Sequence, residues 1–413
     1  MMFAHGRRHN FLNTKVVKPN CFTRLFYIVL FLLFCRNVVV IYHLYKINSV
    51  DRLYSYSALF VGAVFIFWFI LTHLNYKIDF LMLLFTQCVT ECFSSTINSG
   101  TLKIPIMSFI YLCAIYCFSM YITIEKRFPF FLKDISILFL LLATINLFLM
   151  GSNGVYYKEQ WYFLGLENQI SFTLLLGLYF NWLNSVYNND KITLLLYIIV
   201  YTASSVIIWS ASAMLAVILF LLIKYVPLVY QAIKRMPTQV TLIVVVAILL
   251  FLVYYTLFGV ENSFIKWLVV DILKKDITFT GRTHIWNILL KRVSHKPLFG
   301  YGIHKSSDIF IVGGHSLSAH NAFLAHLYSG GIVSMLIITL LFYISVKLIN
   351  NIKSQDIKNI HKIMIFLISV PLMSEAVSLN SLYIMLFIGV GISVNSTEQK
   401  IHNKITRRVN YDT

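Results

Sequence analysis

The sequence predicts an all-α, polytopic integral membrane protein with about 12 transmembrane helices, and three observations support this fold class. Hydrophobic residues make up 59% of the 413 residues and charged residues only 12%, whereas soluble proteins carry about 25% charged residues. Apolar runs approach the length that a membrane-spanning helix needs, about 20 residues, and they recur along nearly the whole chain. One large loop, residues 259–319, interrupts them in the second half.

We expect a single membrane-embedded domain over residues 1–413, because no repeat, low-complexity tract or Pro/Gly linker divides the chain. Several runs are short or closely spaced, and the turn at 209–212 is the least certain boundary. The predicted spans are residues 25–45, 56–74, 78–94, 107–124, 135–150, 169–185, 192–209, 212–230, 240–258, 320–349, 363–378 and 380–395.

The distribution of Lys and Arg predicts the orientation. With both termini in the cytoplasm, most Lys and Arg of the short connecting segments fall on the cytoplasmic side, in agreement with the positive-inside rule. The loop 259–319 then lies on the outer side, and its own basic residues do not contradict this because long loops escape the rule. We therefore expect a multi-pass membrane protein with both termini in the cytoplasm.

The net charge of +18 is explained by this topology, so we expect membrane lipids and no nucleic acid as partners. Most of the six cysteines lie inside apolar runs, and Cys88/Cys92 and Cys113/Cys117 are spaced as neighbours on a helix. A metal or redox site would need histidines or carboxylates beside them. We interpret the cysteines as small packing residues and predict no metal site.

The long loop contains an amphipathic pattern at residues 283–293, which predicts a helix that can lie along the membrane surface. Such a helix could also be a structural lid without chemistry. Arg282 precedes it, and a planar, permanently charged guanidinium suits phosphate oxygens, although a lone arginine equally fits lipid headgroups. The apolar face of the helix comprises Ile285, Trp286, Leu289, Leu290 and Val293.

Two histidines follow at the end of the loop, His315 and His320, and Asn321 comes directly after the second. A histidine at the start of an apolar helix, beside the membrane, can work as a general base. Asp308 is the only acid nearby, so the pair is weak evidence for a metal.

Four short motifs follow one another in this part of the chain: Gly281-Arg282-x-x-x-Trp286, Pro297-Leu-Phe-Gly-x-Gly302, His320-Asn321-x-Phe323-Leu324 and Gly330-Gly331-Ile332. Their order and spacing resemble the O-antigen ligase/polymerase superfamily. The turn Leu164-Gly165-Leu-Glu167-Asn168, before the predicted sixth span, also looks like a feature of that family.

The resemblance implies a multi-spanning, cofactor-free and metal-independent glycosyltransferase at the outer face of the inner membrane. Its donor would be an undecaprenyl-diphosphate-linked oligosaccharide and its acceptor a sugar hydroxyl. Arg282 would stabilise the diphosphate and His320 would accept the proton of the hydroxyl. The resemblance further suggests substrate-binding roles for Asn321, His315, Arg292, Trp286, Asn168 and Arg36.

One departure concerns a Ser-Arg pair that many members carry after the seventh span, where this chain reads Ser210-Ala211-Ser212-Ala213. Another cation would then have to take the place of the missing arginine, and the candidates are Lys266, Arg292 and Lys296. Arg36, inside the first span, would either pair with Glu91 or contact the diphosphate.

Several functions fit these motifs. A polymerase would extend one lipid-linked repeat unit with another, giving O-antigen or capsular polysaccharide, and is favoured here because the Ser-Arg is missing. A chain-length regulator protein is then an expected partner. The alternatives are a ligase that transfers the polymer to lipid A-core, a flippase for lipid-linked oligosaccharides, and a scaffold without catalysis. A flippase would carry ionisable residues in the middle of several spans.

Overall fold

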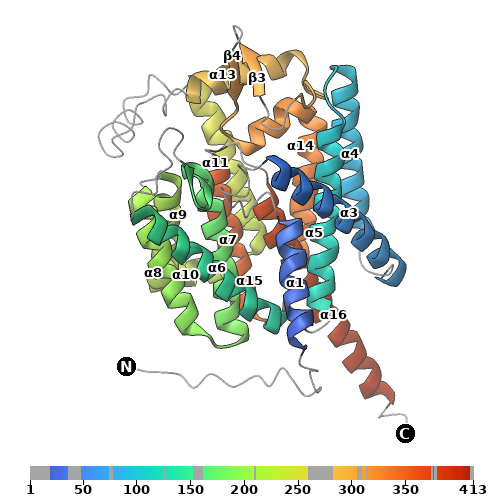
Figure 1. Ribbon diagram of the computed structural model, residues 1–413, viewed down its shortest axis with the longest axis vertical. Coiled ribbons are helices and arrows are strands. Elements are labelled where there is room, and N and C mark those ends of the chain that lie inside the picture. The colour runs from blue at the N-terminus through green and yellow to red at the C-terminus, as the bar shows by residue number, and fades with distance from the viewer. Residues whose placement is uncertain are drawn as a thin grey trace.

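The computed structural model describes residues 19–35, 48–73, 78–124, 127–151, 161–208, 211–258, 282–304, 309–312, 315–373, 375 and 379–409, and the structural statements below concern these residues. Helices dominate the fold (Figure 1). They are α1 (Cys21–Phe34), α3 (Asn48–His73), α4 (Ile78–Ile97), α5 (Lys103–Ile124), α6 (Phe128–Gly151), α7 (Glu167–Tyr187), α8 (Lys191–Ile208), α9 (Ala211–Tyr225), α10 (Pro227–Arg235), α11 (Thr238–Phe258), α13 (Arg282–His295), α14 (Ala322–Ile349), α15 (Gln355–Leu372) and α16 (Asn380–Val409).

Two small antiparallel hairpins are the departure from an all-α chain. One pairs β1 (Trp161–Tyr162) with β2 (Gly165–Leu166), and the other pairs β3 (Ile309–Val312) with β4 (His315–Ser318). The second hairpin lies in the predicted long loop, beside α13 (Figure 1). The prediction of an amphipathic helix at 283–293 is confirmed by α13, whereas residues 259–281 of the same loop lie outside the described part of the chain.

Every predicted span overlaps a helix of the structure. Several of these helices are apolar, as expected of a multi-pass membrane protein. Six of the described helices are long and apolar enough to cross a bilayer, and a bent helix pair would bring the number to seven. These six are α3, α4, α5, α6, α8 and α14. Twelve spans therefore remain a prediction.

The predicted span 212–230 is wrong as a continuous helix. The chain bends by 86° between α9 and α10. Val226 is extended there, with φ −90° and ψ 107°, and Pro227 begins the next helix. Proline lacks the N–H that would continue the helix, and its ring disfavours a helical conformation of the residue before it.

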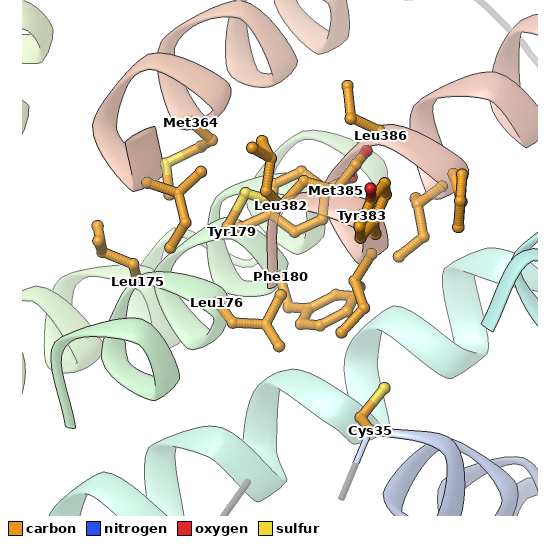
Figure 2. Close-up of a cluster of buried hydrophobic side chains, with 14 of the residues drawn as sticks. Cys35, Leu175, Leu176, Tyr179, Phe180, Met364, Leu382, Tyr383, Met385 and Leu386 are labelled. Atoms are coloured by element: carbon orange, nitrogen blue, oxygen red, sulfur yellow. The ribbon is translucent and has the colours of Figure 1, made fainter. Parts of the chain in front are cut away.

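The interior of the bundle is built from large apolar side chains that meet between α7, α15 and α16. Figure 2 shows Tyr179 and Phe180 of α7 beside Leu382 and Met385 of α16. All four side chains are buried. By contrast, many large apolar residues of α3 are exposed, Phe60 by 72%. A helix that leaves such residues uncovered is typical of one that faces lipid, because lipid tails are as apolar as these side chains.

The two ends of the bundle differ in content. The start of α1 and the end of α16 lie at the same end, while α13 and the β3–β4 hairpin lie at the opposite end (Figure 1). That both termini share one side of the membrane and the long loop lies on the other stays a prediction. We refer to the end with α13 as the loop end.

Candidate active site

Helix α13 is fixed to the loop end through its apolar face. Trp286 is 3% exposed, and its indole N–H donates to the backbone oxygen of Ala319 at 2.7 Å. Leu289 and Val293 are buried in the same cluster, which includes Leu324 of α14. Trp286 therefore anchors α13 beside the His320-Asn321 turn, and its contact with a substrate remains a prediction.

Arg282, the first residue of α13, forms an ion pair with Glu375. Its Nη2 atom lies 2.9 Å from the Oε1 atom of Glu375, and the two side chains are 22% and 9% exposed. The pair brings together the predicted diphosphate-binding arginine and the turn after α15. The sequence offered only a weak signal for Glu375, which is an acid at the end of an apolar run.

Asn321 is the N-cap of α14 and links this helix to the same turn. Its Oδ1 atom accepts hydrogen bonds from the backbone N–H groups of Phe323 and Leu324, each at 3.0 Å. Its Nδ2 atom donates to the backbone oxygen of Met373 at 2.9 Å. Because Asn321 is 1% exposed, its evident role is structural, and a direct role in binding substrate stays a prediction.

His320 has an unusual backbone conformation, with a φ of 44°. This left-handed conformation is strained for a residue other than glycine. It lies between Ala319, which accepts from Trp286, and the cap residue Asn321, so both neighbours are fixed. The partly exposed ring makes no hydrogen bond to any described residue. His320 therefore lies on the rim of the site that contains Arg282 and Glu375.

Four other residues predicted for the site lie partly or wholly outside the described part of the chain. His315 lies on β4, and Asn168 lies in the first turn of α7, but the side chains of both fall outside the described part. Arg36 and Lys266 lie wholly outside the described residues.

Two further cations, Arg292 and Lys296, lie at the far end of α13 from Arg282. A rise of 1.5 Å per residue puts the backbones of Arg282 and Arg292 about 15 Å apart, which is too far for their backbones to flank one diphosphate closely. The ammonium of Lys296 lies 4.9 Å from the centre of the Tyr301 ring and contacts Asn98, the residue after α4. Replacement of the missing arginine by Arg292 or Lys296 stays a prediction.

The Pro297–Gly302 motif has a structural role, because its backbone forms hydrogen bonds with α14 where that helix is interrupted. Gly331 interrupts the helix with φ 66° and ψ −166°. The freed N–H of Ile332 donates to the oxygen of Pro297 at 2.8 Å, and the N–H of Tyr301 donates to the oxygen of Tyr328 at 2.8 Å. The backbones approach so closely that a Cβ on Gly331 would lie 2.3 Å from the Leu298 oxygen.

Helix α4 supports this broken segment from the other side. The hydroxyl of Ser94 donates to the oxygens of Phe299 and Ser329, and the N–H of Ile303 donates to the hydroxyl of Ser95 at 3.0 Å. The glycine motifs thus specify backbone contacts among α4, the 297–303 loop and α14, and these contacts hold the start of α14 in place.

A second acid lies at the α4–α14 interface. Glu91 accepts a hydrogen bond from Nε2 of Gln87 at 2.6 Å, and its Oε1 atom lies 3.5 Å from Nδ1 of His326. The sequence pointed to Arg36 as the partner of Glu91, and that pairing falls outside the described residues. The contact with His326 was missed because residues so far apart in sequence show no pattern.

Metal-ligating side chains are scattered in the structure. Within the described ranges, no three His, Cys, Asp or Glu residues come together in an arrangement that could hold a metal ion. The six cysteines are free thiols, and four of them are buried among apolar neighbours, as packing residues would be: Cys35, Cys88, Cys113 and Cys117. The arrangement at the loop end offers Arg282 paired with Glu375 and the partly exposed His320, which suits an anionic substrate with hydroxyl groups.

Comparison with known proteins gives a family match over part of the chain. No curated protein and no solved structure matches the chain. Residues 192–339 match the family model described as O-antigen ligase, and this range contains Arg282, Trp286, His320, Asn321 and the break in α14. Members of this family are glycosyltransferase-like enzymes that act on lipid-linked glycans. Residues 192–339 are therefore similar to the O-antigen ligase family, which belongs to the O-antigen ligase/polymerase superfamily.

Proposed function

We propose that the protein polymerises undecaprenyl-diphosphate-linked oligosaccharide repeat units into O-antigen or capsular polysaccharide. The observation that carries the proposal is the convergence of Arg282, Glu375 and the His320-Asn321 turn at the loop end of an apolar bundle. The family match over the same residues supports it. In this proposal the loop end faces the periplasm and both termini lie in the cytoplasm, in the inner membrane.

The proposed chemistry is a glycosyl transfer. The acceptor oxygen forms a bond to the anomeric carbon of the donor, while the bond from that carbon to the diphosphate oxygen breaks and its electron pair leaves with the diphosphate. Arg282 stabilises this developing charge, because a preorganised cation acts most strongly in a partly water-excluded site. His320 accepts the proton of the acceptor hydroxyl.

Glu375 gives Arg282 a defined position before the substrate arrives. A half-buried guanidinium without a counter-ion would be costly, and the carboxylate fixes its planar fork. A diphosphate that binds to Arg282 then competes with Glu375 or shares the guanidinium with it. No metal is needed in this scheme, since diphosphate is a good leaving group and Arg282 supplies the positive charge.

Access from the membrane fits the substrate class. A lipid-linked glycan has its diphosphate at the membrane surface, and α13 lies at the end of the bundle where that surface would be (Figure 1). Surrounding lipids and a chain-length regulator protein are the proposed partners.

A ligase that transfers polymer to lipid A-core is the second candidate, favoured by the description of the matched family. We retain the polymerase because residues 210–213 lack the Ser-Arg found in many members. A host that lacks this gene separates the two. Single repeat units on core lipid without long polymer would identify a polymerase, whereas lipid-linked polymer with bare core would identify a ligase and overturn our proposal.

The site is tested in the same host by complementation. We expect His320→Ala and Arg282→Ala to reduce the rate of polymer formation about 100-fold or more. Arg282→Lys should fail equally if the planar fork is required. His304→Ala is the matched control, because His304 is exposed at the same end and its ring forms a hydrogen bond with the backbone oxygen of Tyr301. Full polymer from either alanine variant, at equal expression, would remove that residue from the chemistry.

A further inference from the structure

The interface of α4 and α14 contains a polar cluster that the proposed chemistry does not use. We call it the Glu91 cluster, and it consists of Gln87, Glu91, His326 and Ser334. Nε2 of Gln87 donates to Glu91 and to the hydroxyl of Ser334, each at 2.6 Å. His326 and Ser334 lie on opposite sides of the break at Gly331, so the cluster spans the break.

One atom of this cluster lacks a partner. The Oε1 atom of Gln87 is buried and accepts no hydrogen bond from any described residue. Gln87 as a whole is only 7% exposed and Glu91 only 6%. A buried acceptor without a hydrogen bond loses the water it had in the unfolded chain, so such an atom indicates a ligand or a bound water with a hydrogen to donate.

The Glu91 cluster reaches the protein surface at His326 and contains one acidic side chain. His326, next to Glu91, keeps 28% of its side chain exposed. On α14, His326 and Gly330 lie about half a turn from Leu324 and Tyr328, which pack with α13. The Glu91 cluster therefore faces away from Arg282, and its carboxylate repels a diphosphate while accepting hydrogen bonds from neutral hydroxyls.

We propose that the Glu91 cluster binds hydroxyl groups of the acceptor glycan, with Glu91 and Gln87 Oε1 accepting their hydrogens. The proposal deepens and rests on the proposed function. Arg282 on one face of α14 would hold the diphosphate of the donor, and the Glu91 cluster on the other face would hold the acceptor sugar. Two subsites of opposite charge preference would distinguish the two substrates, although both are lipid-linked glycans.

Thermal unfolding of the purified full-length chain in detergent tests the assignment with two ligands. One is the repeat-unit glycan, released from its lipid by mild acid so that it lacks the diphosphate, and the other is inorganic diphosphate. We expect Gln87→Leu and Glu91→Gln to weaken the apparent glycan affinity about tenfold or more, because each removes or weakens an acceptor for a hydroxyl, while the response to diphosphate stays as in wild type. Arg282→Ala should show the reverse pattern.

The matched control is Gln239→Leu, which makes the same replacement at a glutamine whose Oε1 atom accepts from Asn350 on another helix pair. A preserved diphosphate response shows that each variant is folded. If Gln87→Leu and Glu91→Gln bind the glycan as wild type does, the unpartnered oxygen belongs to a water and the inference is overturned. If wild type binds the glycan through the Glu91 cluster but transfers none, the proposed function fails while the binding site stands.

Discussion

The interior between α7 and its neighbours and the loop end around α14 are stabilised by different kinds of contact. The interior consists of apolar side chains such as Phe180, whose ring lies 5.4 Å from that of Phe31 and 5.7 Å from that of Phe139. The loop end depends on backbone hydrogen bonds, glycines without space for a Cβ, and a buried cap residue. Packing volume therefore sets the stability of the bundle, whereas backbone geometry sets the shape of the site.

The largest expected effect is on stability, from Phe180→Ala. Phe180 is 0% exposed, and removing its ring leaves a cavity among three other phenylalanines. We expect a loss of about 3–5 kcal/mol in the free energy of unfolding, measured by thermal unfolding in detergent, with little change in the activity of the protein that remains folded. Phe60→Ala, on the lipid-facing side of α3, is the control and should cost far less.

Gly331→Ala should affect activity more than stability, the opposite of what we expect for Phe180→Ala. The φ of 66° and the close Leu298 oxygen leave no space for a methyl group. We expect a cost of about 1–3 kcal/mol in stability but almost complete loss of polymer formation, because the start of α14 moves. Gly62→Ala is the matched control, since a Cβ there would meet Ala114 Cβ at an ordinary 3.4 Å. Normal polymer from Gly331→Ala would show that the break in α14 is dispensable.

Asn321→Ala separates capping from chemistry. It removes two cap hydrogen bonds and the bond to Met373, and we expect about 1–2 kcal/mol lower stability. Asn321→Asp keeps the acceptor for the cap but loses the donor to Met373. If Asn321→Asp recovers most of the stability while polymer formation stays low, the hydrogen bond from Asn321 to Met373 matters for the site. If Asn321→Asp restores stability and polymer formation equally, Asn321 acts only as the helix cap of α14.

The smallest expected effect is at Asp190, outside the site and the spans. Burial raises the pKa of Asp190, but hydrogen bonds from Thr193 and Asn184 outweigh it and lower the pKa below its ordinary value. A lowered folded pKa means that the contribution to stability is present above the unfolded pKa of about 3.9 and is lost as the pH falls through the folded pKa.

We therefore expect Asp190→Ala to cost about 1 kcal/mol at neutral pH, as loss of the cap of α8. The cost should shrink on acidification. Unfolding temperatures measured between neutral and strongly acidic pH test this. Asp190→Asn keeps a capping side chain without the charge, and an unchanged pH dependence in that variant would refute the assignment.

The sequence could predict those parts of the site that depend on local pattern. The amphipathic spacing of 283–293 was sufficient for α13, and the motifs placed Arg282, Trp286 and His320 in one region. Glu375 and His326 were beyond its reach, because their partners Arg282 and Glu91 are far away along the chain. No periodicity encodes which acid meets which cation across a helix interface.

The same division holds for the fold. Composition and apolar runs determined that the chain is helical and membrane-embedded, because burying so much apolar surface requires a lipid environment. Only the tertiary structure decided that α14 breaks at Gly331 and that the Pro297–Gly302 loop completes its backbone hydrogen bonds. The physical reason is range: hydropathy and propensity act within a few residues, whereas ion pairs, caps and close backbone contacts depend on which distant segments meet in space.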